Sequence, residues 1–196
     1  GQIKKDFNFD CFSWDAIKIA SEALLDNYCK DEELKKEIRK TRHQKNTIHF
    51  NEILSDIHPN FKLPIFQSFY KRLLEQKDTF SEELVVLEGK TTLKISYGIG
   101  GVHSVNNNEI YKETDTHSVI TSDVASLYPT NIINHKLIRY PEVLNKYSSI
   151  KDERIIAKKN KEKKKDTFFK LILNGTSGLI DQEYSWLYYP EGAMKL

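Results

Sequence analysis

The first third of the chain has apolar and polar positions with the period of amphipathic helices. Between Ser13 and Tyr28 apolar residues recur every three or four positions, and Ser13 is the expected N-cap. A second helix is predicted from Asp31 to Arg42, where acids come first and bases last, as the helix dipole prefers. A third is predicted from Pro64 to Lys77, with its large apolar residues on one side.

The pattern changes to a period of two after residue 83. Leu84–Glu88 and Thr91–Tyr97, joined by a Gly-Lys pair, predict a β-hairpin. The loop Gly98–Ser104 follows, and glycines at 98, 100 and 101 allow close approach of a backbone to a ligand. The glycines alone favour a flexible turn, because the spacing is not that of a phosphate-binding loop.

Asp123 stands between a predicted strand and a predicted helix. Thr116–Thr121 is short and rich in β-branched residues, and Pro129–His135 has proline at the expected first helical position. A carboxylate at such a turn lies beside the free N–H groups of a helix start, so a metal-binding oxygen lies next to an anion site. A divalent metal bound to a polyphosphate needs both.

Beyond Tyr140-Pro141, which is expected to break the chain, the sequence predicts a basic helical hairpin. A long polar helix should run from Asn145 to Lys165, followed by a turn at Asp166-Thr167 and a second helix from Phe168 to about Gly175. The end of the chain, from Ser177 onward, returns to apolar and aromatic residues and is expected to pack onto the sheet.

Two pairs of residues in this hairpin suggest an anion site. Arg154 and Lys158 are four apart on the first helix, and Lys170 and Asn174 are four apart on the second. An antiparallel hairpin can bring them together as three cations and an amide around a triphosphate. The alternative, that the basic helix is only a solvated face, stays open at this point.

Composition narrows the class of protein. The chain has 196 residues, 39% apolar and 30% charged, with a formal net charge of +2. Cys11 and Cys29 form no paired motif, which favours a reducing compartment such as the cytoplasm over a disulfide scaffold. No leader opens the chain, and no apolar run approaches a membrane span, so no membrane partner is expected. The abrupt end at Leu196 suggests a fragment.

Two separated segments resemble motifs of family B DNA polymerases. Asp123–Pro129 resembles motif A, Asp-x-x-Ser-Leu-Tyr-Pro, and Lys170–Gly178 resembles motif B, Lys-x-x-x-Asn-Ser-x-Tyr-Gly. Motif B departs at Gly175 and Ser177, where the family has serine and tyrosine, so the contact with the nascent base pair is not carried over. The loop at Tyr97–Ser104 resembles the region that touches template in phage-type members. The resemblance covers roughly residues 80–190 and is closest to phage or prophage polymerases.

The resemblance implies an α+β fold, with a partial antiparallel palm sheet, packed helices and a projecting two-helix fingers hairpin. The implied domains are a helical region at 1–80, the first part of the palm at 81–144, the fingers at 145–176 and a truncated return to the palm at 177–196. The implied compartment is the cytoplasm, that of a bacterial host if the source is a phage or prophage.

It also implies an activity, the transfer of dNMP from dNTP to a primer 3′ end on primer–template DNA, with two Mg²⁺ ions. Asp123 would bind both ions, the Val124 carbonyl would join the second, and Tyr128 would pack under the sugar and exclude a 2′-hydroxyl. The residues implied to hold the nucleotide are Val124, Ser126, Leu127, Tyr128, Arg154, Lys158, Lys170 and Asn174, and those implied to touch DNA are Tyr97, Gly100, Gly101 and Gly178.

One part of the family's metal site has no counterpart after Gly178. The family completes its metal site with an Asp-x-Asp beyond motif B, and none follows Gly178 here. The isolated chain is therefore expected to be inactive. A second interpretation is a module, derived from a polymerase, that binds nucleic acid or nucleotide without chemistry. A third is an α+β domain with a solvated basic helix and an unrelated role.

Overall fold

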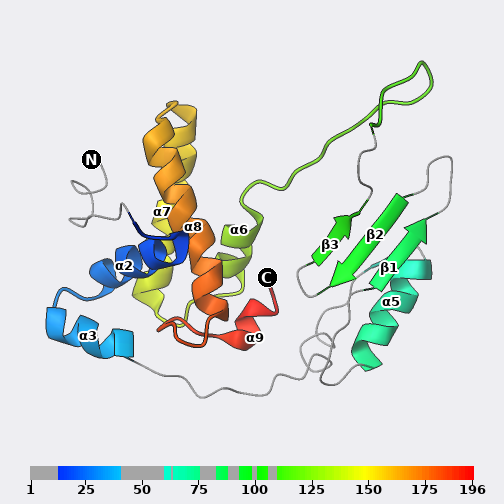
Figure 1. Cartoon of the computed structure of the whole chain (residues 1–196). Helices are drawn as coiled ribbons and strands as arrows, with labels where there is room; N and C mark the ends of the chain where they lie inside the picture. The colour runs from blue at the N-terminus through cyan, green and yellow to red at the C-terminus, as the bar shows by residue number, and fades with distance from the viewer. Residues whose placement is uncertain are drawn as a thin grey trace. The chain divides into compact units, whose positions relative to one another are not determined.

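The computed structural model describes residues 13–40, 60–62, 64–75, 83–87, 93–98, 101–105 and 110–196. The chain divides into two compact units, which are described one at a time. One is formed by residues 1–48 and 124–196 and is helical where it is described; the other is formed by residues 49–123 and holds a sheet (Figure 1). The ambiguous segment Asn46–Ile57 and Cys11 lie outside the described residues.

The helical unit begins with α2 (Ala16–Tyr28) and α3 (Glu32–Lys40). Asp15, not the predicted Ser13, caps α2: its carboxylate accepts from the backbone N–H of Lys18 at 2.8 Å. The carboxylate of Asp31 accepts from the first N–H groups of α3 in the same way. Both predicted helices are therefore present, and they begin one to three residues later than predicted.

The second part of this unit contains α6 (Leu127–Asn134), α7 (Pro141–Lys159), α8 (Lys163–Asp181) and the short α9 (Pro190–Ala193). Figure 1 shows α7 and α8 side by side, with their connected ends extending beyond α2 and α6. Tyr140-Pro141 marks a boundary as predicted, since residues 135–140 are not helical, but α7 begins at Pro141 and not at the predicted Asn145. The predicted turn at Asp166-Thr167 is also wrong: the turn is at residues 160–162, and Lys161 has φ 59°.

The core of the helical unit forms where α2 packs along α8. Trp186 is buried in this core, and its indole N–H donates to the Ser21 hydroxyl at 3.1 Å. The C-terminal segment thus packs on helices, which corrects the expectation that it packs on the sheet. The largest fully buried side chains are Tyr147, Leu24, Leu25, Ile132, Leu137, Ile150, Ile172, Leu173 and Ile180.

The other unit contains α5 (Pro64–Glu75) and a three-stranded antiparallel sheet in the order β1-β2-β3. The strands are β1 (Glu83–Leu87), β2 (Leu93–Gly98) and β3 (Gly101–Ser104). Leu87 pairs with Leu93 in the first hairpin and Gly98 with Gly101 in the second. The hairpin of β1 and β2 agrees with the sequence pattern, whereas the second half of the predicted Gly98–Ser104 loop is a strand.

The strand expected before Asp123 is absent. Residues 118–124 have no regular structure, and the isolated bridge between Thr114 and His117 is the nearest β pairing. β-Branched residues favour a strand only where a sheet face covers them, and here Val119 and Ile120 are 50% and 86% exposed. The described chain is therefore mostly helical with one small sheet, and that sheet does not lead into Asp123 as a palm sheet should.

The two units are defined by contacts within the structure, whereas the four predicted domains were defined by sequence motifs. The division into units therefore does not test the boundaries at residues 80, 144 and 176, which stay a prediction. Within the described ranges, no helix is both long enough and apolar enough to cross a membrane.

Candidate anion-binding surface

Two contacts fix the register of the hairpin formed by α7 and α8. The buried Tyr147 hydroxyl donates to the backbone carbonyl of Leu173 at 3.0 Å, and Nε of Arg154 donates to Oδ1 of Asp166 at 2.9 Å. Each pair is symmetric about residue 160, in the connecting turn. The register of the two helices is therefore fixed from the connecting turn to the core.

This register places the predicted anion-binding residues along a row. From the pair of Arg154 and Asp166, Lys158 is one helical turn nearer the connecting turn and Lys170 is one helical turn farther from it. The two lysines are thus separated by about 12 Å along the hairpin. They do not surround a single point, as the spacing suggested, but can follow an extended anion.

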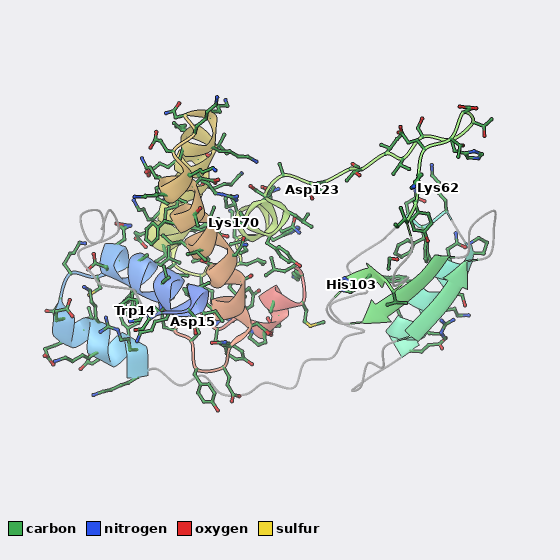
Figure 2. The ribbon with its side chains drawn as sticks, turned by 45° about the horizontal axis from the view of Figure 1, so that its top comes forward. Trp14, Asp15, Lys62, His103, Asp123 and Lys170 are labelled. Carbon is green, nitrogen blue, oxygen red and sulfur yellow. The ribbon has the colours of Figure 1, made fainter. Side chains whose placement is uncertain are left out.

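Lys158, Lys170 and Asn174 are exposed, and their side chains have no hydrogen-bond or ion-pair partner within the described ranges. Figure 2 labels Lys170 on α8, between the connecting turn and the crossing with α2. The two lysine charges and the Asn174 amide are available to an external ligand. A solvated basic face also has exposed lysines, so exposure does not separate the two interpretations.

Arg154 is the exception, because it is paired inside the hairpin. Its side chain is 19% exposed and that of Asp166 is 28% exposed. The contact uses Nε, and the two terminal nitrogens of the guanidinium have no partner among the residues that the structure describes. Four of its five N–H donors are therefore free to meet a ligand.

Sequence reasoning missed Asp166 because it placed this residue in a turn. The available signal was its spacing: Asp166, Lys170 and Asn174 recur every four residues and lie on one side of α8. An acid in the first turn of a helix is also a common position for a carboxylate.

Within the motif A segment, α6 begins at Leu127, two residues before Pro129, where the helix was predicted to begin. Ser126 has a left-handed backbone, with φ 55° and ψ 45°, and its carbonyl accepts from the N–H of Thr130. The N–H groups of the first helical residues, Leu127 and Tyr128, have no partner inside the helix. The local backbone thus offers donors to an anion, as the sequence suggested. Val124, Leu127 and Tyr128 are 62%, 45% and 48% exposed.

Asp123 is exposed and belongs to the other compact unit, of which it is the last residue (Figure 2). Lys170 belongs to the helical unit, so the two residues lie in different units. In the described ranges, no group of three or more histidine, cysteine, aspartate or glutamate side chains could hold a metal ion. Asp123 alone does not complete the expected two-magnesium site, so the magnesium assignment stays a prediction.

The residues expected to touch DNA are spread over both units. Tyr97 lies in β2 and Gly101 begins β3, while Gly100 lies outside the described residues. Gly178 lies in α8 against the side chain of Ile17. These roles stay predictions.

Gly175, where the resemblance breaks, has a packing role. It is buried in α8, and a Cβ there would collide with the backbone carbonyl of Ala16. Glycine therefore permits the close crossing of α2 and α8.

Comparison with known proteins returned no matching family model, no matching curated protein and no matching solved structure.

Proposed function

We propose that the row of Arg154, Lys158, Lys170 and Asn174 binds the triphosphate of a nucleoside triphosphate. In this proposal the chain is part of a DNA-directed DNA polymerase of the family B type. The observation that carries it is the pair of unpartnered lysines held one turn above and one turn below Arg154 by the register of the hairpin. The order of the motif A and motif B segments supports the polymerase assignment.

The chemistry of phosphoryl transfer suits such a surface. The reaction needs little covalent help from the protein and depends mainly on positioning and on neutralising charge. In the proposed reaction the primer 3′-oxygen attacks the α-phosphorus and pyrophosphate leaves. Lys158 and Lys170 would neutralise the phosphates as point charges, Arg154 would hold two oxygens with its fork, and the Asn174 amide would donate a further hydrogen bond.

The chain by itself is expected to have negligible polymerase activity, because Asp123 is a single carboxylate where the chemistry needs more than one. Two Mg²⁺ ions remain part of the proposal for the complete enzyme. Template-directed extension of a primer by this chain alone would contradict the expectation.

The test of nucleotide binding compares variants of the hairpin. Lys170→Ala and Lys158→Ala should each weaken binding of a fluorescent dNTP about tenfold or more, since a hydrogen bond to a charged group is lost. Lys159→Ala is the matched control, because Lys159 is also exposed and lies next to Lys158, on another side of α7. Unchanged affinity in both Lys158→Ala and Lys170→Ala would overturn the proposal.

A second candidate function is binding of nucleic acid without chemistry. The connecting end of the hairpin, residues 158–165, has six lysines and a single acid, Glu162. No ion pair involves these lysines in the described part of the chain, although Lys165 lies 5.6 Å from the centre of the Phe169 ring. Such a cluster favours a phosphodiester backbone through release of counterions.

This alternative has its own experiment. Replacing Lys159, Lys161 and Lys164 with glutamine should reduce the salt dependence of DNA binding, by up to about one unit of slope per lost phosphate contact. These three residues lie outside the proposed triphosphate row, so dNTP affinity should hardly change. A triple variant with the wild-type salt slope would rule this function out.

A further inference from the structure

We infer that Asp166 is a positioning residue, which holds Arg154 so that the terminal nitrogens of the guanidinium face the triphosphate. The inference rests on the proposed function and assigns a role to a residue outside the motif resemblance. It starts from an apparent conflict: the surface proposed to bind an anion contains a carboxylate in contact with one of its cations.

The geometry of the contact resolves the conflict. Arginine has two edges that can bind an oxygen pair, one with Nε and a terminal nitrogen and the other with both terminal nitrogens. The contact recorded between Asp166 and Arg154 uses Nε alone, at 2.9 Å from Oδ1. The edge formed by the two terminal nitrogens is left for a bidentate contact with phosphate oxygens.

The surroundings hold this arrangement in place. Asp166 is in the first turn of α8, where the helix dipole stabilises a negative charge. Both side chains are partly buried between the helices, which restricts their rotamers. A guanidinium ordered before the ligand arrives loses less conformational entropy on binding.

Charge acts in the opposite direction. The Asp166 carboxylate repels a triphosphate, so removing its charge should strengthen binding, while removing its acceptor oxygen should release Arg154 and weaken binding. Asp166→Asn separates the two effects, since the amide oxygen can still accept from Nε but carries no charge. Asp166→Ala removes the charge and the acceptor together.

The experiment measures affinity for a fluorescent dNTP in the complete chain. Asp166→Asn should bind at least as tightly as the wild type, and Asp166→Ala should bind three- to tenfold more weakly. The loss in Asp166→Ala should disappear in an Arg154→Ala background, because Asp166 acts through Arg154. Thermal unfolding of each variant shows whether the fold is intact.

Affinity in Asp166→Ala equal to or above that of the wild type would overturn the inference, since only the charge would then matter. An equal loss in the Arg154→Ala background would also overturn it. A direct readout needs no nucleotide: the Nε–H of Arg154 should exchange slowly with solvent in the wild type and in Asp166→Asn, and rapidly in Asp166→Ala. Equal exchange rates in all three would contradict the proposed contact.

The two proposals fail in different ways. If Lys158→Ala and Lys170→Ala both bind dNTP as the wild type does, the triphosphate site is wrong and the role of Asp166 falls with it. If Lys170→Ala loses affinity and Asp166→Ala does not, the triphosphate site stands and the positioning role is wrong.

Discussion

At Gly175, close helix packing explains why this chain departs from a motif that the segment otherwise resembles. The family motif has serine at this position, yet α8 here is crossed so closely by α2 that a Cβ would meet the carbonyl carbon of Ala16 at 2.6 Å, and its oxygen closer still. These atoms belong to the backbone of Ala16, so they cannot move away by a change of rotamer. The departure from the motif is therefore explained by the α2–α8 crossing, without reference to a nucleotide.

Restoring the family serine should destabilise the protein. Gly175→Ser is expected to lower the free energy of unfolding by about 1–3 kcal/mol, because α2 and α8 must move apart. Urea unfolding followed by tryptophan fluorescence measures this. Gly178→Ala is the matched control: its Cβ would meet only the flexible side chain of Ile17, at 2.8 Å from Cδ1, and alanine favours a helix over glycine. An equal loss in both variants would contradict the explanation.

Tyr147 gives a second prediction at a single residue. Its buried hydroxyl donates to the Leu173 carbonyl, and burial raises the pKa of this phenol above the ordinary value of 10.0. Tyr147→Phe should cost about 1 kcal/mol, measured by urea unfolding. Because the raised pKa favours the neutral form in the folded state, the wild type should lose stability as the pH rises above 10.0, and the variant should lack that part of the loss. Parallel curves above pH 10 would contradict this.

At the scale of secondary-structure elements, ion pairs join α2 to α3, and the side chains in these pairs differ in exposure. Lys35 is buried, and its ammonium contacts Asp26 and Glu32, each at 2.6 Å. Burial by itself lowers the pKa of Lys35, but the hydrogen bonds to the two carboxylates outweigh it and the net pKa is raised. For Asp26, burial acts to raise the pKa, and the hydrogen bonds from Lys35 and Lys30 outweigh it, so the net pKa is lowered.

The pH dependence follows from the sign of the Asp26 shift. A lowered carboxyl pKa contributes stability above the ordinary value of 3.8, and this stability is lost as the pH falls through the lower folded value. Asp26→Asn should remove that contribution, costing about 1 kcal/mol at neutral pH once the exposure of the carboxylate is allowed for. Unfolding measured from pH 7 to pH 2 tests this. Glu33→Gln, in the exposed pair with Lys36, should change little, and an equal effect there would count against the prediction.

Element boundaries show what the sequence could and could not predict. The helices α2 and α5 and the β1–β2 hairpin follow from local periodicity, and α3 follows from its order of acidic and basic residues. The hairpin turn was misplaced because three consecutive lysines, 163–165, carry no apolar period, although lysine is a good helix former and begins α8 here. The predicted strand at Thr116–Thr121 failed for the opposite reason: local composition favoured it, but a strand needs a pairing partner, which only tertiary structure provides.

The candidate site, too, could be predicted from the sequence only in part. The spacing of Arg154, Lys158, Lys170 and Asn174 identified which residues share a helix face. It did not predict their order along the hairpin, because that order depends on where the turn falls. The pairing of Arg154 with Asp166 could not be foreseen for the same reason.

At the scale of the whole molecule, the two compact units should unfold separately. Both tryptophans of the chain, Trp14 and Trp186, belong to the helical unit, so tryptophan fluorescence reports that unit alone. Circular dichroism reports both. We expect the urea transitions seen by the two methods to differ in midpoint, as in other proteins with two domains. Coincident transitions would show instead that the units unfold together.

The hydrogen bond from Trp186 to Ser21 joins residues 165 positions apart. This contact has a consequence for synthesis on the ribosome. At about 5–20 residues per second, α2 leaves the ribosome roughly ten to thirty seconds before the segment that covers it. During that interval its apolar side has no native partner, so the nascent chain is expected to need a chaperone to shield α2 until α8 emerges.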